Sequence, residues 1–252
     1  MDQSLLQPDE ARAVEVFNPA GSARFVLLCD HAGRALPRRL GSLGLSEEAL
    51  CSHIAWDIGA LGVAQKMALA LDAPLVFQRY SRLVIDCNRP LSAPDSIPET
   101  SGGLAIQGNH GLTALEKQAR QREIFAPYHA SIAELLAERP GYHLVTVHSF
   151  TPELFGVRRP FHAGVLYERD TRLARPLLSL LRQDSALVVG DNEPYAASAT
   201  SDFAIIEYGE RAGAPYVELE VRQDLVADAA GQQLWSERFA RLLHSASNAF
   251  HS

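Results

Sequence analysis

Two histidines and one aspartate are the residues of this chain best suited to bind a metal ion. His31 follows the apolar run 25–29, His148 follows the similar run 144–147, and Asp57 stands at the expected start of a helix. Two histidines with one carboxylate are a common ligand set of catalytic zinc sites, in which a further position stays open for water. Simpler alternatives remain open: a loop histidine, a helix-capping aspartate and a hydrogen-bonded core histidine.

A second group of candidate residues lies in the segment 80–90, which carries Arg82, Asn88 and Arg89. The planar guanidinium of arginine matches the geometry of a carboxylate, so these residues could bind an acidic substrate. The alternative is ordinary ion pairing, with Asp86 as the partner of either arginine.

The third group is a run of alternating apolar and charged residues at 217–224, which places Glu218, Glu220 and Arg222 on one face of an expected strand. Burying two acids in a strand is costly unless they are paired. We expect one of them to pair with Arg222 and the other to serve in acid–base chemistry. Glu220 is nearer the carboxyl end of the strand, where sites in open α/β sheets lie, and is therefore preferred. A solvated strand face is the alternative.

Alternating strands and helices must position these groups, and the alternation predicts an α/β fold with a mostly parallel sheet. A capping box at residues 113–116 opens a long helix to about residue 138. We expect residues 1–24 to be a loosely held arm and residues 25–252 to form a single domain. Strands are predicted at 25–29, 75–77, 83–85, 144–147, 163–167, 186–189 and 216–221, and further helices start near Ser46, Asp57, Asp170 and Gly231.

The composition excludes several classes of function. With 252 residues, 47% of them hydrophobic, the chain can bury a large core. The net charge of -7 argues against a nucleic-acid partner, and no apolar run is long enough for a membrane span. The three cysteines have no paired spacing, and residues 1–15 lack the apolar core of a signal peptide. We therefore expect a cytoplasmic protein with reduced thiols.

Taken together, these motifs resemble the N-formylglutamate amidohydrolase family, which is similar in fold to zinc carboxypeptidases and aspartoacylases. The resemblance implies an open, mixed, mostly parallel sheet with helices on both faces, a three-layer sandwich that holds one zinc ion. The matching segments are CDHAG at 29–33, HIAWDIGA at 53–60, YSRLVIDCNRP at 80–90, VTVHSFTP at 145–152, RRPFHAGVLYERD at 158–170, GDNEPY at 190–195 and VELEVRQDL at 217–225.

Carried over position by position, the resemblance implies roles for individual residues. It implies that the zinc ligands are His31, Asp57 and His148. Glu220 is then the general base, and Arg82 polarises the scissile carbonyl. Asn88 and Arg89 would bind the substrate carboxylate, and Arg159 is a candidate for holding a second acidic group.

The activity implied is hydrolysis of the linear amide of a small N-acylated amino acid such as N-formylglutamate. The chain departs from the expected pattern at Arg34, where carboxypeptidases have a glutamate ligand, and at Tyr208, where relatives are expected to have histidine. An N-acyl amino acid deacylase of different acyl specificity and a non-catalytic carboxylate-binding module are the alternatives. The metal's identity, the oligomeric state and the roles of His53, His110 and His162 stay open.

Overall fold

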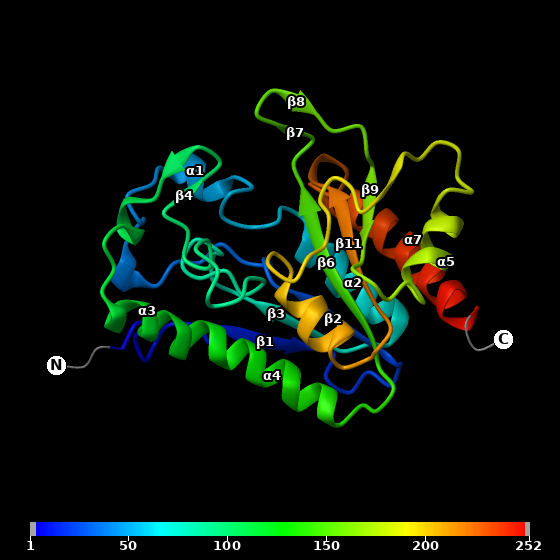
Figure 1. Ribbon diagram of the computed structural model, residues 1–252, viewed down its shortest axis with the longest axis horizontal. Helices are drawn as coiled ribbons and strands as arrows, with labels where there is room; N and C mark the ends of the chain where they lie inside the picture. The colour runs from blue at the N-terminus through cyan, green and yellow to red at the C-terminus, as the bar shows by residue number, and fades with distance from the viewer. Residues whose placement is uncertain (1–3, 250–252) are drawn as a thin grey trace.

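The computed structural model describes residues 4–249, which form a central seven-stranded sheet flanked by helices (Figure 1). The strand order is β1-β3-β2-β6-β11-β9-β10. These strands are β1 (Val14–Phe17), β2 (Phe25–Cys29), β3 (Leu75–Gln78), β6 (His143–Phe150), β9 (Ala163–Leu166), β10 (Val189–Asp191) and β11 (Tyr216–Arg222).

The four central strands β3, β2, β6 and β11 run parallel. At the edges, β1 is antiparallel to β3, and β9 is antiparallel to β11 but parallel to β10. Every residue of β2, β3 and β6 is buried, so both faces of the sheet are covered. Helix α2 (Ala60–Leu71) packs on β2 and β6 and is backed by α7 (Ala229–Asn248), while α4 (Ala126–Ala137) packs on β3 and β1. The mixed, mostly parallel sheet confirms the predicted fold class.

Helix caps predicted from the sequence are present at two sites. The Thr113 hydroxyl accepts from the backbone N–H of Glu116, whose carboxylate accepts from the backbone N–H of Thr113. The helix that follows runs as α3 (Ala114–Arg120), a π-helical turn η3 (Gln121–Phe125) and α4. Ser46 caps α1 (Glu47–Cys51) through the backbone N–H of Ala49. Both observations confirm the capping signals in the sequence.

The strand predicted at residues 83–85 is wrong. The segment is buried but forms turns. The side-chain amide of Asn109 donates to the carbonyl of Leu83, and the guanidinium of Arg120 donates to the carbonyl of Val84. Because side chains satisfy these backbone groups, the apolar run can be buried without a place in the sheet.

Other boundaries also differ from the predictions. Part of the expected N-terminal arm forms β1, which pairs with β3 at the edge of the sheet. His148 and Ser149 lie within β6 and not after it. Asp170 does not cap α5 (Ala174–Leu181), because its carboxylate accepts from Arg172 instead.

Short elements occupy the two loops at 87–112 and 150–161. The first loop contains the β4–β5 hairpin, and the second contains the β7–β8 hairpin, which projects beyond the end of the sheet (Figure 1). Within residues 4–249, no helix is both long and apolar enough to cross a bilayer. The short elements are β4 (Thr100–Ser101), β5 (Leu104–Ala105), β7 (Glu153–Leu154), β8 (Val157–Arg158), α6 (Phe203–Ile205), and the 3-10 or π turns η1 (Arg38–Leu40), η2 (Gln107–Asn109), η4 (Ile206–Glu210) and η5 (Gln223–Leu225).

Candidate active site

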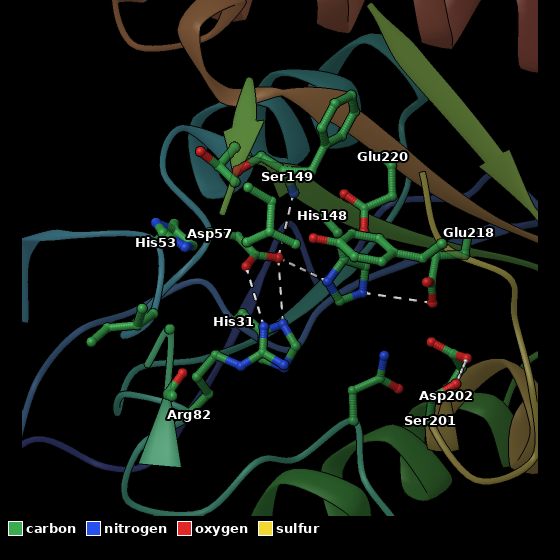
Figure 2. A pocket seen from close by; sticks show the side chains of 18 of the residues that line it. His31, His53, Asp57, Arg82, His148, Ser149, Ser201, Asp202, Glu218 and Glu220 are labelled. Carbon is green, nitrogen blue, oxygen red and sulfur yellow. Dashed lines mark hydrogen bonds and ion pairs between the residues drawn. The ribbon is translucent and has the colours of Figure 1, made fainter. Parts of the chain in front are cut away.

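A cavity of about 480 Å³ opens at the carboxyl ends of β2, β6 and β11 (Figure 2). Parallel pairing brings the three strand ends to one edge of the sheet, with Glu220 of β11 directly opposite His148 of β6. His31 follows β2 by two residues, and Asp57 precedes α2. The cavity therefore collects the polar residues that end three neighbouring strands.

His31, Asp57 and His148 converge at the base of this cavity, and all three are buried. Each offers one ligand atom, and these atoms lie within 4.8 Å of one another. Asp57 Oδ2 lies 2.9 Å from Nδ1 of His148 and 3.4 Å from Nδ1 of His31. A hydrogen bond from the Asp57 backbone N–H to the carbonyl of His31 holds the two loops together.

The second nitrogen of each histidine ring faces a carboxylate. His31 Nε2 lies 2.7 Å from Asp86 Oδ1, and because a carboxylate only accepts, Nε2 carries the hydrogen. His148 Nε2 lies 3.4 Å from Asp30 Oδ2 and 3.8 Å from Glu218 Oε2. These contacts leave Nδ1 of both rings directed at Asp57. Metal-ligating histidines commonly face a carboxylate with their second ring nitrogen in this way.

The pKa shifts follow from these contacts. Burial alone would raise the pKa of Asp57, but the charge of His31 and the hydrogen bond with His148 hold it far below its usual range. Burial alone would lower the pKa of His148, but Glu218, Asp30 and Asp57 raise it well above its usual value. His31, Asp57 and His148 therefore form a buried cluster in which the charge of each residue shifts the pKa of its neighbours.

The residues present fit a divalent cation. The donor set is two ring nitrogens and one carboxylate oxygen, which suits zinc. The surroundings are rich in buried acid, because the carboxyl groups of Asp30, Asp86, Glu218 and Glu220 are all buried. A divalent cation would offset this negative charge, which is otherwise costly to bury.

Glu218 and Glu220 both line the cavity, but their environments differ. Glu218 Oε2 accepts from the Thr146 hydroxyl at 3.1 Å, and burial together with Asp202 raises its pKa to about 7. Glu220 Oε2 has no hydrogen-bond partner among residues 4–249, and burial raises its pKa well above the ordinary value. The expected pairing of one of these acids with Arg222 is wrong, because Arg222 binds Asp224.

The same cavity that holds the two histidines and Asp57 is also lined by Arg82, Asn88 and Arg89. Arg82 donates from Nε and Nη2 to Asp86 Oδ2, the ion-pair partner considered in the sequence, and its Nη1 lies 3.7 Å from Asp57 Oδ1. Arg89 Nε binds Asp95, and its Nη1 donates to the carbonyl of Ser201.

Arg159 lies behind the cavity wall, against the lining residue Tyr195. It donates from Nη1 to the hydroxyl of Tyr195 and lies over its ring, and its role in holding a second acidic group stays a prediction. Of the other histidines, His53 lines the cavity, His110 pairs with Glu99, and His162 accepts from the backbone N–H of Val188.

Comparison with protein families matches residues 23–227 to the N-formylglutamate amidohydrolase family. The chain belongs to this family. The sequence resemblance is thereby confirmed, and the family indicates a hydrolase that acts on amides. Among proteins with curated functions, none matches the chain.

Solved structures agree with the fold. A gene product of Agrobacterium tumefaciens is similar with a TM-score of 0.95 and 35% identity, over 98% of this chain and 100% of that chain. The N-formylglutamate amidohydrolase of Ralstonia eutropha is similar with a TM-score of 0.68 and 18% identity, over 95% of this chain and 98% of that chain. At that identity, the second similarity speaks for the fold alone.

Sequence reasoning missed several contributors to the site, and Asp86 and Phe155 are two of them. Asp86 contacts both His31 and Arg82, but the sequence shows only an acid close to two arginines. Phe155 lines the cavity from the β7–β8 hairpin, where a lone aromatic residue in a loop follows no recognisable pattern. The only signal for Phe155 was its large apolar side chain beside the turn-forming Gly156.

Proposed function

We propose that the protein is a metal-dependent amidohydrolase that cleaves the linear amide of a small N-acylated amino acid. The observation that carries this proposal is the buried convergence of His31, Asp57 and His148 beside Glu220, one carboxyl oxygen of which has no hydrogen-bond partner within the described part of the chain. Family membership supports the hydrolysis of an amide bond, and N-formylglutamate is the substrate in the family's name. A non-catalytic carboxylate-binding module would have no use for such a group.

His31, Asp57 and His148 would hold the metal ion, and zinc is the ion that this donor set favours. When bound, zinc supplies Lewis-acid polarisation of the scissile carbonyl and makes water more acidic. The carboxylates of Asp86 and Asp30 keep the two histidine rings oriented with Nδ1 towards the site.

Glu220 moves the proton. As the oxygen of water forms a bond to the carbonyl carbon, Glu220 accepts a proton from that water. It then donates the proton to the nitrogen as the C–N bond breaks, which yields a carboxylic acid and a free amino acid. Glu220 has a carboxyl oxygen without a hydrogen-bond partner among residues 4–249, whereas the carboxyl group of Glu218 accepts from the Thr146 hydroxyl.

Two arginines act on the substrate. Asp86 holds the guanidinium of Arg82 so that Nη1 lies 3.7 Å from Oδ1 of Asp57, one of the proposed metal ligands. In this position the guanidinium stabilises the negative charge that develops on the carbonyl oxygen of the substrate. Arg89 binds the substrate carboxylate together with Asn88, whose side-chain oxygen is held by the backbone N–H of Ala204.

The test is a screen of zinc-reconstituted protein on N-formyl and N-acetyl amino acids, with the released acid and amino acid quantified separately. We expect equal amounts of both products from the wild type and little product from Glu220→Gln. The amounts of formate and acetate released show which acyl group the protein removes faster. This comparison decides between a deformylase and a broader deacylase. Failure of the folded, reconstituted protein to hydrolyse any of these amides would contradict the proposal.

A further inference from the structure

The cavity offers little positive charge for a substrate with two carboxylates. Among the described lining residues, the arginines are Arg82 and Arg89. Arg82 donates hydrogen bonds from Nε and Nη2 to the carboxylate of Asp86. Arg159, the expected partner of a second acid, is turned to the hydroxyl and the ring of Tyr195. Arg89 thus serves one substrate carboxylate, and among the described lining residues the other arginine, Arg82, is paired with Asp86.

The cavity lining also contains acidic side chains besides the proposed metal ligand Asp57. Glu218 and Asp202 both contribute carboxyl groups to the cavity wall. Asp202 is held in place by the backbone N–H of Ser198 and the hydroxyl of Ser201. A second carboxylate on this side would meet like charge.

Another part of the wall is apolar. It is built by Ile54, which is buried, and by Leu154 and Phe155 of the β7–β8 hairpin. The β4–β5 turn closes against Ile54, since a Cβ added to Gly102 would lie 2.6 Å from Ile54 Cγ2. Such a wall favours contact with an apolar group and gives a carboxylate no partner.

Phe155 adopts a backbone conformation that its side chain disfavours. Phe155 and Gly156 link the paired residues Leu154 and Val157, with φ of 49° and 77°. Such a two-residue turn prefers asparagine followed by glycine, and a bulky residue at positive φ is an outlier. The side chain is 79% exposed, so packing in the core does not account for it. Strain of this kind points to a role in ligand contact.

We propose that Phe155, Leu154 and Ile54 form a subsite for an apolar group of the substrate next to the scissile amide. The substrate is then an N-acyl amino acid with one carboxylate and an apolar group, in its side chain or in its acyl part, rather than N-formylglutamate. This inference rests on the proposed function and narrows its substrate class.

The test compares three compounds on zinc-loaded protein: N-formyl-L-leucine, N-formyl-L-glutamate and N-hexanoyl-glycine. At least one apolar compound should exceed N-formyl-L-glutamate in kcat/KM by about tenfold or more, a usual discrimination for an apolar pocket. A preference for the leucine compound assigns the subsite to the side chain, and a preference for the hexanoyl compound assigns it to the acyl part. A preference for N-formyl-L-glutamate over both overturns the inference.

Variants of the hairpin test the residues directly. Phe155→Asn removes the ring but suits the positive φ, so the hairpin is kept, and the preference should fall to about threefold or less. Val157→Ala is the matched control, because Val157 is 68% exposed on the same hairpin and lies outside the described lining. It should keep the wild-type preference. Phe155→Lys should shift selectivity towards N-formyl-L-glutamate, whereas Phe155→Tyr should retain the apolar preference.

Binding separates this inference from the proposed function. Dissociation constants measured by calorimetry on zinc-loaded Glu220→Gln report the preference without turnover. If no compound is hydrolysed by the wild type but the apolar ones bind more tightly, the proposed function fails and the subsite stands. Equal binding of apolar and acidic compounds overturns the subsite. It is also overturned if Phe155→Asn changes only the oligomeric mass, because the hairpin is then a protein contact.

Discussion

The carboxylate of Asp86 lies 2.7 Å from Nε2 of His31, and this contact leaves Nδ1 of the same ring directed at Asp57. The other oxygen of Asp86 accepts from Arg82. One buried acid therefore orients both a proposed metal ligand and the arginine proposed to act on the carbonyl.

Replacing Asp86 should weaken metal binding. Asp86→Asn keeps an acceptor for His31 but loses the charge and sets an amide against Arg82, so zinc affinity should fall by about 10–100-fold. Competition with a chromophoric chelator measures this change. Asp95→Asn is the control, because Asp95 is an exposed acid paired with Arg89 and should leave zinc affinity unchanged. Equal affinity of Asp86→Asn and the wild type would remove Asp86 from the site.

Glu220→Gln should lower kcat by roughly 10²–10⁴ while zinc remains bound, which is the usual contribution of a general base. The matched variant Glu218→Gln should have a smaller effect, because Glu218 is engaged by Thr146. Turnover and metal content are measured on the same samples. Loss of zinc in Glu220→Gln would instead make Glu220 a ligand, and equal loss of kcat in both variants would leave the choice between them unsupported.

The sequence indicated much of this arrangement because apolar runs mark buried strands and polar residues mark where they end. His31, His148 and Glu220 were singled out in this way, and parallel pairing of β2, β6 and β11 places them at one edge. The position of Asp57 followed from the family resemblance as much as from its own neighbourhood.

The remaining features depend on partners that lie far away in the sequence. Residues 83–85 look like a strand, but their carbonyls are satisfied by Asn109 and Arg120. Arg159 looks from the sequence like a ligand for an acid, and the structure shows that its guanidinium also donates to the hydroxyl of Tyr195. Such pairings become visible only in the folded chain.

Arg89 should determine recognition of the substrate carboxylate. The wild type should prefer an N-formyl amino acid over its C-terminal amide by at least about tenfold in kcat/KM, roughly 1.4 kcal/mol. Arg89→Ala should lose most of this preference, and Arg89→Lys should also be impaired because it keeps the charge without the planar fork. A wild type that hydrolyses acid and amide equally well would leave Arg89 as a partner of Asp95 and the Ser201 carbonyl only.

His129 should make the fold sensitive to acid. Its Nε2 donates to the carbonyl of Cys87 and its Nδ1 accepts from the Tyr208 hydroxyl, so the ring is neutral. Burial lowers the pKa of His129 from 6.5 to about 4. Between these values the unfolded chain binds a proton that the folded chain does not. The free energy of unfolding therefore falls as the pH drops through this window, by at most about 3 kcal/mol from this group.

Urea unfolding of metal-free protein at several pH values between about 7.5 and 4 measures this effect. His129→Gln keeps an amide that can donate to Cys87 but does not titrate, so its unfolding free energy should depend less on pH than that of the wild type. His110→Gln, at an exposed position, should follow the wild type. Identical pH dependence of wild type and His129→Gln would show that the ring does not control acid stability.

The central claim is that His31, Asp57 and His148 bind the metal on which amide hydrolysis depends. The most direct measurement is turnover of an N-formyl amino acid as zinc is added back to chelator-treated protein. The account predicts no turnover before addition, a linear rise to about one equivalent of zinc, and a plateau beyond it, with no recovery in His148→Gln. Full turnover of the metal-free protein would contradict the claim.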